Sequence, residues 1–466
     1  MRKNALVTAL AADAVYTTYS IGRHLRWETG GYDLGLFEQA VRHYAHFQPP
    51  YGELKGDGFN LLGDHFHPIL VAIAPLYRLF PSPLTLLVVQ AALIALSVYV
   101  VTSAAQRVLG ERPGLLVGAA YALSWGIQAA LDYEFHEIAF AVPMLALCID
   151  NLMRERYRHA VCWAAGLVLV KEDLPITVVA LGAVLWLLGK RRLGVGVAIF
   201  GVVAFVLIMF VALPAMSYWD HYTYWSYTGV TGERSTGERL ADLVSATKLW
   251  GVLALLIPVA FLALRSPVTL LAAPTVAWHL VSSNPAYSSM KYHYALPLMP
   301  IVFLGTRDAL RRNPRPFGRF TRYVPVYLLA IGVLSVATGP FGNMLRPSWW
   351  SHSPYARHAE AATSLVPDGA RVAAHNRLAA HLTSDRTVFL LDRDLKDTTG
   401  RTLDVDWVVA ETTGGRFPID PPTRQRLLAD LQGCGFVKVY DRDGFVTLRR
   451  VDPAARGEAL AACLRS

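Results

Sequence analysis

The chain has 466 residues, of which 53% are hydrophobic and only 17% are charged. A soluble domain typically carries about 25% charged residues, so this composition and a mean hydropathy of +0.33 argue against a soluble protein. Several apolar runs approach the roughly 20 residues that cross a bilayer as a helix, which predicts a polytopic membrane protein. The net charge of +9 does not indicate nucleic-acid binding, because Lys and Arg gather in short loops between apolar runs.

The apolar runs predict about eleven membrane-spanning helices. They lie at residues 5–22, 83–106, 113–131, 137–152, 159–170, 174–189, 193–216, 248–264, 267–282, 294–308 and 323–340. The first run follows Arg2 and Lys3 and lacks a signal-peptide cleavage pattern, so we expect it to be retained. The run 68–80 is too short to cross and predicts an interfacial or re-entrant helix. The short runs on either side of Lys171 and of Arg265 are each compatible with one broken helix.

The distribution of basic residues predicts the orientation of the chain. With the N-terminus in the cytoplasm, the predicted inner loops hold about twice as many Lys and Arg as the predicted outer loops. The C-terminus then lies outside, and every loop rich in acids, histidines and aromatic residues falls on the outer face. We therefore expect recognition or chemistry on the extracytoplasmic face.

From residue 346 the composition changes to that of a small α/β domain, so we divide the chain into a transmembrane domain, 1–345, and an extracytoplasmic domain, 346–466. The predicted strands lie at 371–374, 387–391, 406–410, 436–440 and 445–448, the last two as a hairpin. Residues 423–431 predict a helix. This domain shows no glycine-rich phosphate-binding pattern, so docking or covering a substrate is as compatible with it as chemistry.

The four cysteines are scattered along the chain. Cys148 and Cys162 lie in apolar segments, whereas Cys434 and Cys463 lie in the C-terminal domain. No CxxC pair or metal-ligand spacing is present, so the sequence predicts neither a disulfide framework nor a zinc site.

Asp33 lies just after the first predicted span, in a loop that is otherwise mostly aromatic and apolar. A carboxylate anchored there suits a general base, which must lie within hydrogen-bond reach of the hydroxyl that it deprotonates. The alternative is that Asp33 caps a short helix over residues 34–47, because Asp is a favoured N-cap residue. Spacing alone does not separate these interpretations. Glu38, five residues further on, is a second acid that could contact the substrate.

A second polar group, Asp64, His65 and His67, precedes Pro68. If this segment is extended, both imidazoles point to one face and suit a divalent metal together with an acid. The alternative is that they are interfacial residues bonded to backbone carbonyls.

Glu134, His136 and Glu137 lie at the outer ends of the third and fourth predicted spans. They could complete a metal site with His65 and His67, or form a hydrogen-bonded acid–base cluster. An ordinary polar loop is the alternative. A divalent metal is therefore a candidate cofactor, although the spacing does not require one.

Lys171, Glu172 and Asp173 form a charged group between two short apolar runs. Charges at this depth are costly and usually face a cavity, so we expect Lys171 to pair with a lipid phosphate. The alternative is a mutually neutralising structural cluster at a helix break.

Lys291, Tyr292 and His293 form a further outer group. A lysine beside aromatic rings suits a phosphate with a sugar stacked next to it. Aromatic residues are also common at membrane interfaces, and the same alternative applies to Trp219 and Tyr222.

Four stretches carry a family resemblance: YDLGLFEQAVRHYAHFQPPY, LLGDHFHPILVAIAPLYRLFPSPLTLLVVQA, YEFHEIAFAVPML and LVLVKEDLPITVVALG. Together they resemble the bacterial membrane family labelled domain of unknown function 2079, over nearly the whole chain. That family is grouped with the GT-C glycosyltransferases, which resemble the dolichyl-phosphate-mannose protein mannosyltransferases.

The resemblance implies a GT-C-like membrane domain that takes a sugar from a polyprenyl-phosphate donor on the outer face, usually with inversion. GT-C enzymes share an Asp in the first outer loop as catalytic base or acceptor-orienting group, and Asp33 is the residue that matches. Many of them have an acidic pair there, whereas here the next acid is Glu38. The resemblance thus implies a reaction class but no particular sugar or acceptor.

The leading hypothesis is a membrane glycosyltransferase that transfers sugar to a hydroxyl of a cell-envelope glycan, lipid or protein, with Asp33 as base. One alternative is a transporter or flippase for a lipid-linked or polyprenyl-linked substrate, for which a broken helix at Lys171 would be suitable. The polar groups of this chain, however, gather on one predicted face, and no inverted repeat is visible in the sequence. Another alternative is a non-catalytic assembly protein whose outer domain binds a partner.

Overall fold

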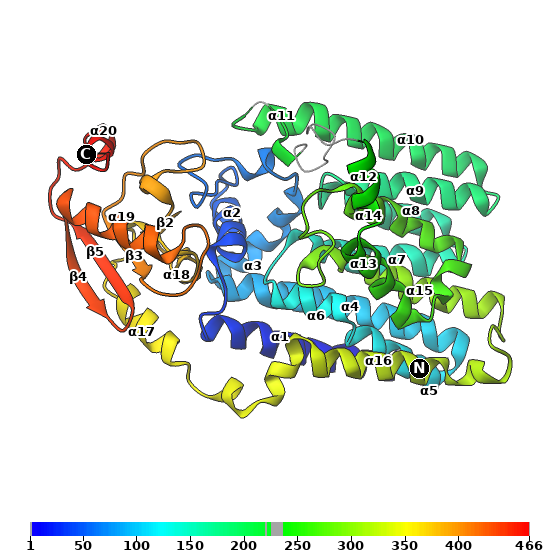
Figure 1. Cartoon of the computed structure of the whole chain (residues 1–466). Helices are drawn as coiled ribbons and strands as arrows, with labels where there is room; N and C mark the ends of the chain where they lie inside the picture. The colour runs from blue at the N-terminus through cyan, green and yellow to red at the C-terminus, as the bar shows by residue number, and fades with distance from the viewer. Residues whose placement is uncertain (1, 220, 225–235, 466) are drawn as a thin grey trace. The chain divides into compact units, whose positions relative to one another are not determined.

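The computed structural model describes residues 2–219, 221–224 and 236–465, most of them helical (Figure 1). The chain divides into two compact units. The membrane unit consists of Met1–Ser20, Leu62–Ile69 and Val89–Arg346, and the sheet unit of Ile21–Leu61, Leu70–Val88 and Pro347–Ser466. The segment Ile21–Leu61, which carries Asp33, therefore groups with the C-terminal residues Pro347–Ser466.

The predicted apolar runs all contain helix, because long runs of Leu, Val and Ala satisfy their backbone hydrogen bonds internally. The helices are α1 (Arg2–Leu25), α4 (Pro83–Leu109), α5 (Glu111–Ala122), α6 (Trp125–Asp132), α7 (Ala141–Met153), α8 (Tyr157–Ala165), α9 (Leu174–Leu187), α10 (Arg191–Leu207), α11 (Leu213–Met216), α12 (Thr236–Leu243), α13 (Ala246–Leu256), α14 (Ala273–Val281), α15 (Leu298–Arg312) and α16 (Val324–Thr338). Helices α1 and α4 each belong partly to the sheet unit.

Among the described residues, five helical segments are long and apolar enough to cross a membrane. They are Pro83–Leu109, Glu111–Asp132, Arg191–Met216, Ala241–Val259 and Gly318–Thr338. Shorter apolar helices lie at Pro68–Leu79, Leu174–Leu187 and Pro267–Val281, the first of which occupies the run predicted as a short helix. A helical membrane fold is confirmed, whereas the count of about eleven spans stays a prediction.

Helices α9 and α10 lie side by side (Figure 1). Their backbones approach closely where Gly182 of α9 faces Gly194 of α10. A Cβ on either glycine would lie 2.6 Å from the carbonyl oxygen of the other, so only glycine fits at both positions. This close pair supports one side of the cavity described below.

The sheet unit contains one mixed sheet with strand order β2-β1-β3-β5-β4 (Figure 1). Its strands are β1 (Arg371–Ala374), β2 (Thr387–Leu390), β3 (Trp407–Glu411), β4 (Phe436–Arg442) and β5 (Phe445–Arg450). Strand β1 is parallel to both β2 and β3, and β5 is antiparallel to β3 and β4. The five predicted strands and the hairpin are confirmed, with ends that differ by at most two residues.

The helices of the sheet unit are α2 (Leu36–Ala45), α3 (Ala74–Leu79), α17 (Pro354–Thr363), α18 (Asn376–Ala379), α19 (Pro421–Gly433) and α20 (Gly457–Cys463). Leu427 and Leu431 of α19, within the predicted helix, belong to the same core as Phe389 and Val408 of the sheet.

Cys434 and Cys463 form a disulfide, with their Cα atoms 5.8 Å apart, that links the end of α19 to α20. The expectation of no disulfide was therefore wrong for this pair. The two cysteines are 29 residues apart, and their spacing in the sequence does not show that they meet in space.

Candidate functional site

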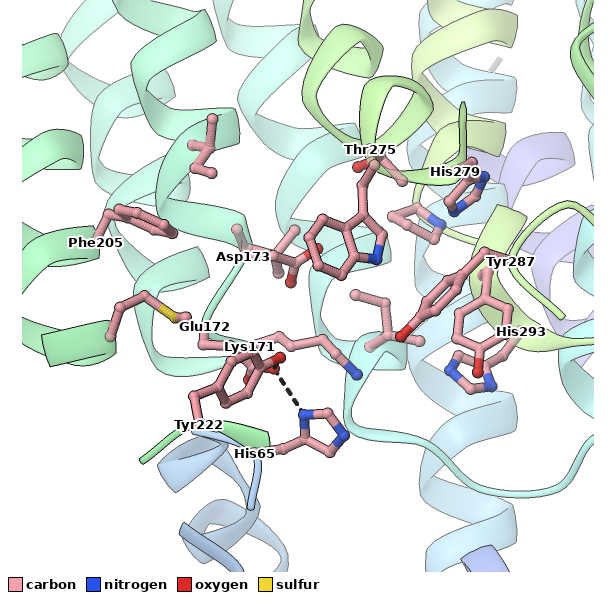
Figure 2. A pocket seen from close by; sticks show the side chains of 17 residues that line it. His65, Lys171, Glu172, Asp173, Phe205, Tyr222, Thr275, His279, Tyr287 and His293 are labelled. Atoms are coloured by element: carbon pink, nitrogen blue, oxygen red, sulfur yellow. Dashed lines mark hydrogen bonds and ion pairs between the residues drawn. The ribbon is translucent and has the colours of Figure 1, made fainter. Parts of the chain in front are cut away.

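The membrane unit holds a cavity of ≈ 180 Å³ (Figure 2). Its walls come from α9, α10 and α14 and from the loops that precede α9 and α15. Figure 2 shows Phe205 at one end, His279, Tyr287 and His293 at the other, and Lys171 between them. The cavity therefore combines an apolar end, a charged centre and an aromatic end.

Glu172 is held by a network of donors at the centre of the cavity. Its Oε1 lies 2.6 Å from His65 Nδ1 and accepts the Tyr222 hydroxyl at 2.7 Å, and its Oε2 accepts the Phe66 N–H at 3.0 Å. Burial alone raises a carboxyl pKa, but the His65 ring and the other donors hold the pKa of Glu172 well below its ordinary range. Burial opposes the charged form of His65, yet the Glu172 carboxylate raises the pKa of that ring. The two side chains form an imidazolium–carboxylate pair.

Lys171 forms a second ion pair, with its Nζ 2.6 Å from Oε1 of Glu137 at the turn before α7. The Lys171 side chain is 18% exposed and that of Glu137 only 1%. Burial would lower the pKa of Lys171, but the Glu137, Glu172 and Asp173 carboxylates raise it well above its ordinary value. Lys171 is thus a permanently charged ammonium in a largely buried place.

Asp173 occupies the N-cap position of α9, but its side chain makes no capping hydrogen bond. Its Oδ1 is buried and has no hydrogen-bond partner among the described residues. Burial raises the pKa of Asp173 to about 6 against the opposing effect of Lys171. A cavity-lining carboxyl that titrates near neutral pH suits contact with a ligand hydroxyl.

Aromatic rings form the other end of the cavity. His293 stacks on His136 with ring centroids 3.6 Å apart, and Tyr287 packs against Tyr294 with centroids 4.3 Å apart. Trp278 meets Tyr287 edge-on at 6.0 Å. Flat rings that surround a cavity offer stacking surfaces for a ring-shaped ligand.

The cavity brings together part of the predicted site. His65, Lys171 and His293 line it, and Glu137 supports it through Lys171. Lys291 is exposed and is not among the lining residues.

The other predicted residues of the membrane unit have identifiable neighbours. Tyr292 packs edge-on against Tyr133, with ring centroids 4.6 Å apart. Asp64 accepts a hydrogen bond from the Tyr224 hydroxyl at 3.2 Å. His67 is buried, and burial lowers its pKa to about 4, so this ring is neutral.

The loop that carries Glu134 and His136 is fixed by Gln90 of α4. The Gln90 amide donates to the Glu134 carbonyl at 2.5 Å and accepts the His136 N–H at 2.9 Å. Within the described part of the chain, no group of three or more His, Cys, Asp and Glu side chains is arranged to hold a metal ion. These residues as placed do not fit the candidate divalent metal.

Asp33 lies in the sheet unit, in the π-helical turn Gly31–Gly35 that leads into α2, and is half-buried. Helix α2 begins at Leu36 with Gly35 as its N-cap and no side-chain capping bond, so the interpretation of Asp33 as a helix cap is wrong.

Glu38 of α2 is completely buried in the sheet unit. Its carboxyl oxygens accept hydrogen bonds from the Tyr77 and Ser384 hydroxyls at 2.8 Å each and from the Thr383 hydroxyl. Burial raises the pKa of Glu38 more than these donors lower it. This placement favours a structural role over the predicted contact with a substrate.

Asp173 was predicted only as part of a charged group, and Trp278 and Tyr287 were not predicted as site residues. The available signal was Trp278-His279 inside an otherwise apolar run, because a polar ring there suggests a cavity. Phe205 is also part of the cavity, but nothing distinguishes it in the sequence from an ordinary lipid-facing residue.

A family model described as "Predicted membrane protein (DUF2079)" matches residues 23–447 of the chain. No curated protein matches the chain.

Solved structures of similar fold are found among membrane glycosyltransferases of the GT-C type. ArnT from Cupriavidus metallidurans bound to undecaprenyl phosphate is similar over 96% of this chain and 98% of its own, with 14% identity and a TM-score of 0.55. Its apo state is similar over 95% and 97%, with 14% identity and a TM-score of 0.51. Arabinofuranosyltransferase AftD from Mycobacteria is similar over 97% of this chain and 40% of its own, with 15% identity and a TM-score of 0.47.

Proposed function

The chain belongs to the predicted membrane proteins of family DUF2079 and has a GT-C-like fold, and from this premise we propose that it is an inverting membrane glycosyltransferase. It moves a sugar from a polyprenyl-phosphate donor to an acceptor hydroxyl of a cell-envelope glycan, lipid or protein. The observation that carries the proposal is the amphipathic cavity. Its apolar end, with Ile176, Phe205 and Met209, suits a polyprenyl chain, and its cationic centre at Lys171 suits a phosphate. The fold neighbour ArnT holds undecaprenyl phosphate, which supports the same class of lipid here.

In the proposed reaction, the oxygen of the acceptor hydroxyl attacks the anomeric carbon of the sugar, and Asp33 accepts the proton of that hydroxyl. The new carbon–oxygen bond forms as the bond from the anomeric carbon to the phosphate oxygen breaks. Polyprenyl phosphate leaves with the electron pair of the broken bond. Because the acceptor attacks from the side opposite to the leaving phosphate, the configuration at the anomeric carbon is inverted. Lys171 and the His65 imidazolium stabilise the charge that develops on the leaving phosphate.

The aromatic end of the cavity is proposed to stack on the sugar. Tyr287 and His293 offer flat faces there, and Asp173 offers an acceptor for a sugar hydroxyl. Lys291 and Tyr292 do not line the cavity, and we propose that they contact the donor as it enters the cavity.

We place the reaction on the extracytoplasmic side of the cell membrane, with the N-terminus in the cytoplasm, on the basis of the loop charges. The Cys434–Cys463 disulfide supports this orientation, because disulfides persist in oxidising compartments and are rare in the cytosol.

Asp33→Asn is the direct test of the proposed base. Purified protein in nanodiscs would be incubated with labelled polyprenyl-phosphate sugars and envelope extracts, with and without EDTA. We expect turnover to fall by about 10²–10⁴-fold, the usual contribution of a general base, while donor binding is retained. Asp430→Asn, at an exposed position of α19, is the matched control and should retain turnover.

Full turnover by the Asp33→Asn variant would refute the base assignment. Donor binding without any turnover by the wild-type protein would contradict a glycosyltransferase and favour a transporter or an assembly protein. Loss of turnover with EDTA would show that the reaction needs a divalent metal.

A further inference from the structure

The first outer loop contacts the carboxyl edge of the parallel strands in the sheet unit. Strands β2 and β3 lie on opposite sides of β1, so the strand order reverses at this edge, the place where open α/β sheets usually bind ligands. Asn376 follows β1, and Phe417 lies in the loop after β3. Asn376 Oδ1 accepts the Tyr32 N–H at 2.9 Å, and the Phe417 ring packs edge-on against the Tyr32 ring at 5.5 Å. A segment of the same chain therefore lies where such a fold would otherwise hold a ligand.

The loop backbone packs directly on α18. A Cβ on Gly30 would lie 2.6 Å from Asn376 Nδ2, and a Cβ on Gly31 would lie 2.7 Å from the Ala379 Cβ. Neither position has room for a side chain, so the two glycines permit the close approach that brings the Tyr32 N–H to Asn376.

The chain before Asp33 is held by the residues that follow Asn376. Arg377 Nε donates to the Trp27 carbonyl at 3.0 Å, and the His381 ring stacks on the Trp27 ring with centroids 3.7 Å apart. Both contacts are made by Trp27, six residues before Asp33, so they fix the point at which the loop begins.

The chain after Asp33 is held by α2. The Gln39 amide donates to the Val388 carbonyl of β2 at 2.9 Å, and Arg42 Nη1 donates to the Thr383 carbonyl at 2.7 Å. Asp33 thus lies on a short segment whose two ends and centre are all bonded to the C-terminal domain.

The loop that carries Phe417 is held in place by hydrogen bonds from α19. Arg424 of α19 is fully buried and donates to the carbonyls of Glu411 at 2.6 Å, Gly414 at 2.7 Å and Ile419 at 3.0 Å. These bonds satisfy the guanidinium without an acid and fix the loop on both sides of Phe417.

We infer that the C-terminal α/β domain is the scaffold that positions Asp33, and that Asn376 is a positioning residue acting through the Tyr32 backbone. This inference rests on the proposed role of Asp33 as base. It gives the domain a function in the reaction although the domain carries no phosphate-binding pattern of its own.

The test compares Asn376→Ala with Asn376→Asp, which keeps the acceptor oxygen, in the full-length protein in nanodiscs. Hydrogen exchange of peptides covering residues 28–36 reports on the loop without any need for substrate. We expect Asn376→Ala to speed exchange there several-fold and to lower kcat by about 10- to 100-fold at unchanged KM for the donor, because small displacements of a catalytic group have costs of this size. Asn376→Asp should stay close to wild type.

Two further variants complete the design. Phe417→Leu, at a half-exposed side chain, removes the ring contact with little risk to folding and should give a smaller change in the same direction. Gln432→Ala removes an exposed amide that bonds within α19 and should change neither readout.

Unchanged exchange at 28–36 in both Asn376→Ala and Phe417→Leu would overturn the inference, as would unchanged kcat where exchange has risen. A wild-type protein that transfers no sugar would refute the proposed function instead. The exchange data alone would then decide whether the domain holds the loop.

Discussion

Two buried glutamates, one in each unit, have opposite surroundings. Glu172 in the membrane unit faces an imidazole, a backbone N–H and a tyrosine, and it lines a cavity. Glu38 in the sheet unit faces three hydroxyl groups and does not line the cavity that Glu172 lines. The pKa of Glu172 is lowered and that of Glu38 is raised, although burial acts on both in the same direction.

The difference shows that burial alone does not identify a functional carboxylate. A cationic partner keeps Glu172 ionised beside a space large enough for a ligand, so its charge can act on that ligand. Neutral hydroxyls hold Glu38 in place without fixing a charge. Under the proposed function, the ionic region around Lys171 and Glu172 therefore serves binding. The hydroxyl-bonded region around Glu38 serves the docking of α2 onto residues 383–384.

The largest effect is expected when Lys171, the cation of the ionic region, is removed. Lys171→Met leaves Glu137 buried without its partner, and we expect a loss of about 3–5 kcal/mol in the free energy of unfolding. Turnover should also fall by at least about 100-fold, because the leaving phosphate loses its cation. Thermal unfolding in nanodiscs and the transfer assay measure the two effects.

The double variant Lys171→Met/Glu137→Gln separates structure from function. Replacing both charges by neutral groups of similar size should recover most of the stability, since no unpaired charge remains. Turnover should stay low. A double variant that regains turnover would show that Lys171 only neutralises Glu137.

Neutralising Glu172 and Glu38 in separate variants tests whether the two glutamates have different roles. We expect effects on stability that are smaller than that of Lys171→Met. Glu172→Gln removes a charge-assisted bond to His65 and should cost about 1.5–3 kcal/mol of stability with a clear loss of donor affinity. Glu38→Gln keeps a buried polar group among hydroxyls and should cost about 1 kcal/mol with donor affinity unchanged. Equal losses of donor affinity in the two variants would contradict the assignment of separate roles.

The smallest expected effect concerns Asp173 and pH. Its pKa of about 6 in the folded protein lies above its ordinary value of 3.8, so between these values the folded state binds a proton that the unfolded state releases. The contribution of this group to stability is therefore present at acid pH and is lost as the pH rises through 6. Asp173→Asn should remove this dependence, so the difference in thermal midpoint between variant and wild type should change between pH 4 and pH 7. An unchanged difference would place the Asp173 carboxyl in water.

Local patterns were enough to predict most of the fold. Hydrophobic runs showed the helices, and the short apolar runs at 371–374 and 387–391 became β1 and β2 because buried parallel strands have that pattern. The disulfide and the grouping of the loop that carries Asp33 with the C-terminal domain were not predictable in this way. Both depend on contacts between residues far apart in the sequence, and the Tyr32–Asn376 bond spans 344 residues.

The candidate site was predictable where a charge was out of place. Lys171 and Glu172 stood out in an apolar stretch, and both line the cavity. Their ion-pair partners His65 and Glu137 were also predicted as candidates, but the pairing was not, because His65 is 107 residues from Glu172. An isolated tyrosine such as Tyr222 is indistinguishable in the sequence from an interfacial one. Asp33 stood out as an acid in a mostly aromatic and apolar loop, and the family resemblance then favoured its role as base. Its neighbours in the sheet unit had no signal in the sequence.

If the chain is the proposed glycosyltransferase, the two ion pairs beside the cavity have a consequence for the protein between turnovers. Lys171 is matched by Glu137 and His65 by Glu172, so the protein carries its own counter-ions when no phosphate is bound. An arriving phosphate competes for cations that are already neutralised, which moderates its affinity, and on departure it leaves no bare charge behind. The polyprenyl phosphate of the proposed reaction can then be exchanged without a large free-energy barrier, and the empty site returns to the same resting arrangement.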